Sequence, residues 1–103
     1  MRFHAGRRKL PPAFLGATEG SGAVKTIFIM VKCELGQAYK VADEAVENVE
    51  QVSEIHSISG QYDLLLKCYL SDEQDIGHFV NETIQTLPGV KDTFTLIAFK
   101  AFT

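Results

Sequence analysis

The regular spacing of apolar and polar positions begins at Lys25 and predicts six elements in the order strand, helix, strand, strand, helix, strand. Residues 27–31 are continuously apolar and mostly β-branched, which is typical of a strand buried on both faces. Gly36 ends this strand. Apolar residues then recur at helical spacing, with charged residues on the opposite side, which predicts an amphipathic helix whose buried face is Ala38, Val41, Ala42, Ala45, Val46 and Val49.

The second half of the chain predicts a hairpin, a helix and a last strand. Residues 52–59 are extended in character and reach the turn 60–63, after which residues 64–66 start the next strand. Ser71 and Gln74 have the spacing of a capping box, so we expect the second helix to begin there. Pro88-Gly89 predicts its end. The residues expected on its buried face are Ile76, Phe79, Val80, Ile84 and Leu87.

Residues 90–102 alternate as a strand, and the two halves of the chain match at an offset of 38 positions, which aligns Val52 with Val90 and Ile58 with Leu96. Such a repeat predicts a split βαβ arrangement with pseudo-twofold symmetry. Right-handed crossovers then give the ferredoxin-like α+β fold, a four-stranded antiparallel sheet in the order 4-1-3-2 with both helices on one face.

The sheet face without helices should be polar in a monomer, but the first and last strands are apolar on both faces. An exposed apolar face usually marks an interface, and two such sheets can pack face to face, as in a dimeric α/β-barrel. We therefore expect a homodimer through the sheets. The alternative is that the C-terminal segment covers this face within one chain. The residues predicted for the dimer interface are Phe28, Met30, Phe94, Leu96, Ile97 and Phe99.

Composition narrows the class of protein. The 103 residues suffice for one domain, and 46% hydrophobic with 22% charged residues is ordinary for a globular protein. The formal charge of -3 has the wrong sign for neutralising several phosphates, so we expect no direct nucleic-acid binding. No apolar stretch has the length of a membrane span or the form of a secretory signal, which predicts a cytoplasmic protein with no membrane partner.

Residues 1–23 and the two cysteines carry no regular pattern of their own. The leader combines a basic cluster with Pro11-Pro12 and a Gly/Ser-rich end, so we interpret residues 1–23 as a disordered extension, or as an artefact of the chosen start site, before a domain at 24–103. Cys33 and Cys68 are expected to be buried thiols. In the predicted fold they lie about 16 Å apart along the strands, too far for a disulfide.

The chemistry-bearing residues form no catalytic group. No nucleophile, base and orienting residue are seen to converge, and no metal or cofactor motif is present, so we predict neither an enzyme nor a bound metal or cofactor. The most distinctive segment is Gly60-Gln61-Tyr62-Asp63. A glycine turn exposes backbone N–H groups that can receive a carboxylate, and Asp63 can accept from an ammonium group. A routine hairpin in which Asp63 satisfies its own turn is the alternative.

Residues 25–102 as a whole resemble the C-terminal effector domain of the Lrp/AsnC regulators, the RAM domain. The resemblance rests on the opening strand with Gly36, the turn 60–63, the sequence Leu87-Pro88-Gly89-Val90, and residues 92–95. It implies the ferredoxin-like fold, dimers through the sheets and assembly into octamers or other rings. It also implies that an amino acid or similar small effector binds between dimers, at positions that correspond here to Gly60, Gln61, Tyr62, Asp63, Thr93 and Thr95.

The family's full-length members carry a helix-turn-helix domain before this module, whereas only 23 residues precede it here. The sequence is thus interpreted as a stand-alone effector-binding and oligomerisation module, acting in transcriptional regulation alone or with full-length relatives. Two rivals share the fold: a small dimeric α/β-barrel enzyme of monooxygenase or isomerase type, and an ACT-like amino-acid-binding module that regulates an attached enzyme. Shared fold alone does not decide among them.

Overall fold

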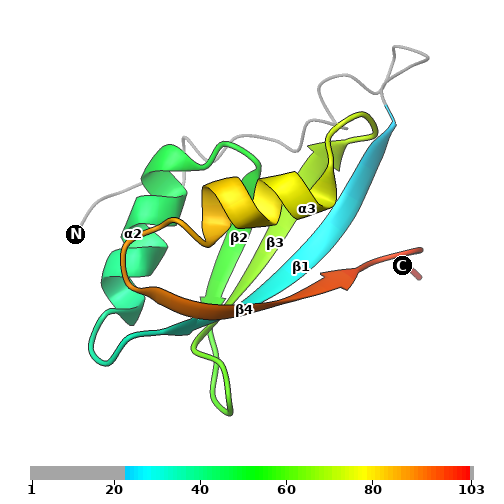
Figure 1. Ribbon diagram of the computed structural model, residues 1–103. Coiled ribbons are helices and arrows are strands. Elements are labelled where there is room, and N and C mark those ends of the chain that lie inside the picture. Colours follow the sequence, from blue (N-terminus) through cyan, green and yellow to red (C-terminus); the bar gives the residue numbers. More distant parts are fainter. Residues whose placement is uncertain (1–22, 103) are drawn as a thin grey trace.

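The computed structural model describes residues 23–102, which form one layer of sheet and one layer of helices. The elements are β1 (Val24–Cys33), α2 (Ala38–Asn48), β2 (Val52–Ser57), β3 (Leu64–Ser71), α3 (Ile76–Phe79), the π-helical segment η1 (Val80–Ile84) and β4 (Val90–Ile97). The four strands are antiparallel in the order β2-β3-β1-β4, and the helices lie on one side of them (Figure 1). The predicted ferredoxin-like fold and strand order are confirmed. The prediction for residues 1–22 lies outside the described residues.

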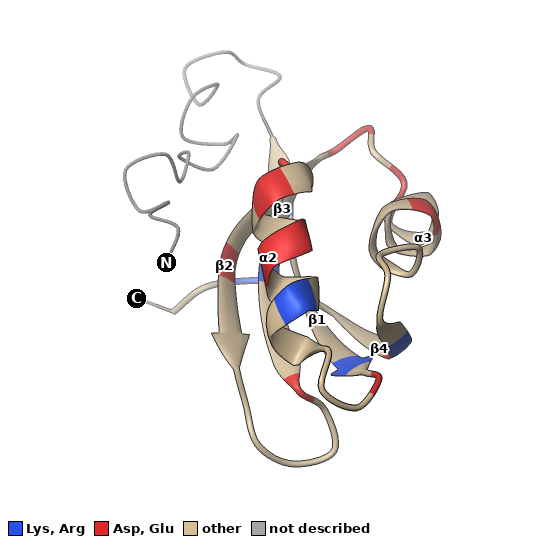
Figure 2. Ribbon diagram, turned by 90° about the vertical axis from the view of Figure 1, so that its left-hand side faces the viewer, with Lys and Arg blue, Asp and Glu red and all other residues tan. Residues whose placement is uncertain are grey.

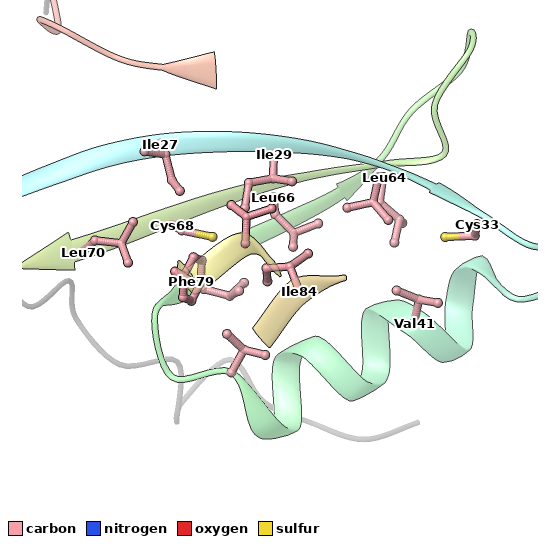
Figure 3. Close-up of a cluster of buried hydrophobic side chains, with 14 residues drawn as sticks. Ile27, Ile29, Cys33, Val41, Leu64, Leu66, Cys68, Leu70, Phe79 and Ile84 are labelled. Atoms are coloured by element: carbon pink, nitrogen blue, oxygen red, sulfur yellow. The ribbon is translucent and has the colours of Figure 1, made fainter. Parts of the chain in front are cut away.

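The core fills the space between the sheet and the helices. β1 and β3 alternate regularly, so that every second side chain points towards the helices and is buried. Figure 3 shows these side chains meeting those of α2, α3 and η1. The residues that contribute the largest fully buried side chains are Ile27, Ile29, Leu64, Leu66, Leu70 and Ile84. Both cysteines are buried and free, as predicted.

A glycine turn fixes the end of β1 against the start of β4. Val90 N donates to Leu87 O at 3.2 Å, and Gly89 in this turn has φ 94°. A Cβ at Gly89 would lie 2.9 Å from a methyl group of Val41, so the position needs glycine for space as well as for conformation. Gly89 O also accepts from Glu34 N at 2.8 Å. The turn at Pro88-Gly89, predicted to end the second helix, therefore also contacts residues from the first half of the chain.

The predicted start of the second helix is wrong. Ser71 remains in β3, where it pairs with Val24, and residues 71–74 form a turn closed by Gln74 N donating to Ser71 O. The helix begins at Ile76, and its cap is Asp75, whose carboxylate accepts from His78 N at 2.8 Å. Because Ser71 is part of β3, it does not cap the helix. Asp75, four residues later, takes this role.

Two predicted strand ends also shift inward. β2 ends at Ser57 and β4 at Ile97, although Ala98 N still donates to Thr26 O at 3.1 Å. A β-bulge between Lys32 and Cys33 interrupts the pairing of β1 with β4. No helix within residues 23–102 has the length and apolarity needed to cross a membrane.

Candidate functional site

The turn between β2 and β3 projects from one end of the sheet, where β1 ends and β4 begins (Figure 1). Gly60 has φ 112° there, and no atom lies within 4 Å of the position a Cβ would occupy, so the conformation and not crowding selects glycine. Ile58 N donates to Asp63 O at 3.0 Å and closes the base of the turn. This hydrogen bond fixes the base of the turn, while the tip at Gly60 is not packed against other residues.

Asp63 joins this turn to the end of β1. Its backbone N–H donates to Val31 O at 2.9 Å, and its carboxylate oxygen Oδ2 accepts from Cys33 N at 2.8 Å. The second contact supplies an acceptor for Cys33 at the β-bulge. It leaves the other oxygen, Oδ1, with no donor among residues 23–102. Asp63 therefore has one structural oxygen and one available oxygen.

The tip of the turn exposes donors. Among the described residues, no acceptor is found for the backbone N–H groups of Gly60, Gln61 and Tyr62. Gln61 O accepts from Lys32 Nζ at 3.0 Å, which fixes the Gln61 carbonyl towards β1. N–H groups bind carboxylate and the Asp63 carboxylate binds ammonium, so the turn carries groups suited to both ends of an amino-acid zwitterion.

Tyr62, Thr93 and Thr95 do not converge with Asp63 in one chain. The ring of Tyr62 lies 6.2 Å from that of Phe94, on the sheet face opposite the helices. Thr93 and Thr95 pair with Val31 and Ile29 and therefore face the helices. Of the six predicted effector-binding residues, four lie in the turn, and the two threonines lie on β4, on the opposite face of the sheet from Tyr62.

The residues predicted for the dimer interface also divide between two faces. Phe28 and Met30 pair with Leu96 and Phe94, so these four share the face without helices. Ile97 pairs with Ile27 and faces the helices, although it is 52% exposed. Phe99 follows the end of β4 and lines a groove of about 600 Å³ together with Phe28 and Tyr69.

Sequence reasoning missed two features near these residues. Gln85 directly follows η1, and its Nε2 donates to Thr93 Oγ1 at 2.8 Å. A π-helical turn has no signature in sequence spacing, so this pairing was not predictable. Lys32, Leu35 and Tyr39 line a pocket that also contains Asp63. The only signal for this pocket was an apolar residue, Leu35, directly before the strand-breaking Gly36.

The cysteine near the turn is not poised for reaction. Burial raises the pKa of the Cys33 thiol, and the neighbouring Asp63 carboxylate raises it further, while Lys32 opposes the shift. A thiol with a raised pKa is mostly protonated near neutral pH and is a poor nucleophile. Within residues 23–102 no group of three metal-binding side chains is found.

The sequence and the architecture are similar to those of known proteins. Residues 26–103 match the Lrp/AsnC ligand binding domain. The chain is 30% identical over 76 residues to the leucine-responsive regulatory protein of Escherichia coli K12, a match that covers 72% of this chain and 46% of that protein. It has the same identity over 76 residues to an uncharacterised HTH-type transcriptional regulator of Pyrococcus horikoshii, covering 72% of this chain and 51% of the relative. The chain thus spans about half the length of these relatives.

Solved structures show the same fold. A Thermus thermophilus protein is 30% identical with a TM-score of 0.69, covering 77% of this chain and 98% of that one. Escherichia coli AsnC, at 23% identity and a TM-score of 0.68, shares the fold over 98% of this chain and 60% of its own. The range matched by the family includes the Gly89 turn and the projecting hairpin turn, and by this match the chain belongs to the Lrp/AsnC family as a ligand-binding domain of that family.

Proposed function

We propose that this domain binds a free amino acid at the turn 60–63 and takes part in transcriptional regulation as an effector-binding and oligomerisation module. The observation that carries the proposal is that one turn holds the N–H groups of Gly60, Gln61 and Tyr62, which have no acceptor within residues 23–102, and the available oxygen of Asp63. The name of the leucine-responsive relative, which is 30% identical, supports an amino acid as the effector. The remaining effector contacts, Thr93 and Thr95, come in this proposal from a neighbouring copy, since they lie across the sheet from Tyr62 within one chain.

We propose that two copies pack through the sheet faces that carry no helices. Phe94 and Leu96 are 48% and 42% exposed on this face, and Phe28, Met30 and Leu65 beside them are only partly buried in the single chain. Apolar side chains collected on one face are stabilised when a second sheet removes them from water. Dimers formed in this way leave the turn 60–63 at the end of the sheet, where further dimers could add to give an octamer or another ring.

We propose that the domain does not contact DNA itself and acts through partners in the cytoplasm, full-length relatives among them. Residues 23–102 contain six lysines, no arginine and twelve carboxylates. Figure 2 shows more acidic than basic segments on α2, and further acidic segments on the loop before α3. Such a surface repels phosphates. In this proposal the module spans residues 24–103. An enzymatic role gains no support, since the named relatives are regulators.

A thermal-shift screen against the twenty amino acids tests the effector. A ligand that binds only the folded state raises the free energy of unfolding by about 2.7 kcal/mol at a hundredfold excess over Kd, so millimolar binders are detectable. Leucine is the first ligand to test because of the leucine-responsive relatives. We expect at least one amino acid to raise Tm, and light scattering to report whether it changes the size of the assembly.

Asp63→Asn is the matched variant for this screen. The amide oxygen of asparagine can still accept from Cys33 N, so the β-bulge keeps its hydrogen bond, while the negative charge is lost. We expect the Tm without ligand to be nearly unchanged and the ligand-induced rise in Tm to disappear. An unchanged ligand response in Asp63→Asn would show that Asp63 is purely structural, and a chain indifferent to all twenty amino acids would refute the effector proposal.

A further inference from the structure

A pocket of about 310 Å³ opens beside Asp63, between the hairpin turn and the loop from β1 to α2. Its charged groups are Lys32, Glu34 and Asp63, and its large apolar walls are Leu35 and Tyr39. The volume lies at the lower end of the range for ligand pockets, which favours a small molecule. The pocket next to the proposed effector site is therefore large enough to hold the side chain of a bound amino acid.

The loop that forms the apolar wall is held rigidly. Gln37 N donates to Glu34 O at 3.0 Å, which closes a four-residue turn with Leu35 and Gly36 at its centre. Gly36 has φ 75° at the third position, as a type II turn requires. Glu34 N donates to Gly89 O at 2.8 Å and fixes the loop to the opposite turn. The Leu35 side chain is therefore exposed to water because hydrogen bonds fix the backbone of this loop.

Two large side chains lie exposed in this one pocket. Leu35 is 97% exposed and Tyr39 is 78% exposed. Single exposed apolar residues need no explanation, but two on the wall of a pocket with converging polar groups are typical of a ligand site. The polar part carries two carboxylates, Glu34 and Asp63, against one ammonium group, that of Lys32. This balance favours a cationic amino group and disfavours an acidic side chain.

We propose that the loop 34–39 is the specificity element of the domain and selects amino acids with an aliphatic or thioether side chain. The inference rests on the proposed function. The ligand ammonium group binds Asp63 Oδ1, and the ligand side chain packs against Leu35 and Tyr39. Lys32, through its bond to Gln61 O, holds the hairpin turn against this wall. The turn then binds the part common to all amino acids, and the loop contacts the part that differs.

Isothermal titration with L-leucine, L-methionine, L-alanine and L-glutamate tests the inference on three proteins: the unaltered chain, Leu35→Ala and Phe102→Ala. Phe102 is 87% exposed and lies outside the pocket, so it controls for the loss of an exposed apolar side chain. We expect Leu35→Ala to raise the Kd for leucine and methionine about tenfold, because the lost contact area corresponds to about two buried methylene groups. The Kd for alanine should change less than about twofold, since its side chain does not reach the wall, and Phe102→Ala should change none of the values.

The outcomes separate this inference from the function on which it rests. If the unaltered chain binds leucine and Leu35→Ala binds it equally well, the specificity role is overturned while effector binding stands. The specificity role is also overturned if Leu35→Ala changes the sedimentation coefficient and not the affinity, or if glutamate is the preferred ligand. If the unaltered chain binds no amino acid at all, the proposed function itself fails. A far-ultraviolet spectrum and a Tm equal to those of the unaltered chain establish that Leu35→Ala is folded.

Discussion

The two faces of the sheet are built from the same strands but differ in what covers them. In β1 the buried residues Ile27, Ile29 and Val31 alternate with the half-buried Phe28 and Met30. One set of side chains packs against α2, α3 and η1, and the other set has no helix of the described chain over it. The strand therefore carries apolar side chains on both sides, but folding of the single chain removes only one side from water.

The uncovered face is apolar on β1 and β4 but polar at its β2 edge. There, Glu54 Oε1 lies 3.0 Å from His56 Nε2, and Glu54 Oε2 lies 3.9 Å from Lys67 Nζ. Lys67 Nζ also lies 5.4 Å from the centre of the Tyr69 ring. Among residues 23–102, the core on the helix face contains no buried polar or charged residue. One face is thus built for folding alone, while the other combines an apolar surface for packing with a polar edge that stays compatible with water.

The largest difference between the faces should appear in unfolding. Ile29→Ala creates a cavity in the core and should lower the free energy of unfolding by about 2 to 5 kcal/mol. Met30→Ala, one residue away on the other face, should cost less than about 1 kcal/mol at protein concentrations where the chain is monomeric. Urea unfolding of both variants measures this. Equal losses in dilute solution would mean that the free face is already buried within one chain.

The next largest effect concerns association. Met30→Glu places a charge at the centre of the apolar half and should raise the dimer Kd about a hundredfold or more, since a buried charge without a partner is costly. Sedimentation velocity over a range of concentrations measures the shift. Asn81→Glu, on the exposed side of η1, adds the same charge away from the sheet and should leave the Kd unchanged. An unaltered dimer in Met30→Glu would locate the interface elsewhere.

A smaller effect follows from the thiol on the helix face. Burial raises the pKa of Cys68 to about 12, well above the ordinary value of a thiol. The thiol therefore contributes stability that is fully present below its unfolded pKa and is lost as pH rises towards the folded pKa. Raising pH from 8 to 10 should lower the free energy of unfolding by about 1.4 kcal/mol through this group. Cys68→Ala should remove this part of the alkaline loss, and identical alkaline profiles of the two proteins would contradict it.

The smallest effect is expected at the polar edge of the free face. The hydrogen bond from His56 lowers the pKa of Glu54, Lys67 adds to the shift, and partial desolvation opposes it. A lowered pKa contributes stability above the unfolded pKa of about 4.3, which is lost as pH falls through the folded value. Because Glu54 is half exposed, Glu54→Gln should change the free energy of unfolding by only about a few tenths of a kcal/mol. Differential scanning calorimetry at pH 4 and pH 7 checks this, and a loss above about 1 kcal/mol would indicate that the edge is buried in the assembly.

Local sequence patterns were enough to predict the order of elements, the sheet topology and the apolar character of both faces. These depend on short-range rules: a period of two for β1, a period of 3.6 for α2, and positive φ at Gly36 and Gly89, which only glycine adopts without strain. The internal repeat then leaves one right-handed arrangement of the strands. The turn 60–63 was visible for the same reason, since glycine followed by a carboxylate between two strands is a local pattern.

The partner of each polar side chain, in contrast, follows from the packing of segments that are distant in the sequence. Ser71 has the spacing of a cap but is held by its pairing with Val24, so Asp75 caps the helix. Asp63 accepts from Cys33, thirty positions earlier in the chain, and Gln85 reaches Thr93 from the end of a π-helical turn. These contacts depend on strand register and on how the helices lie against the sheet. No local periodicity encodes them, because each is a choice between partners that only the folded chain brings together.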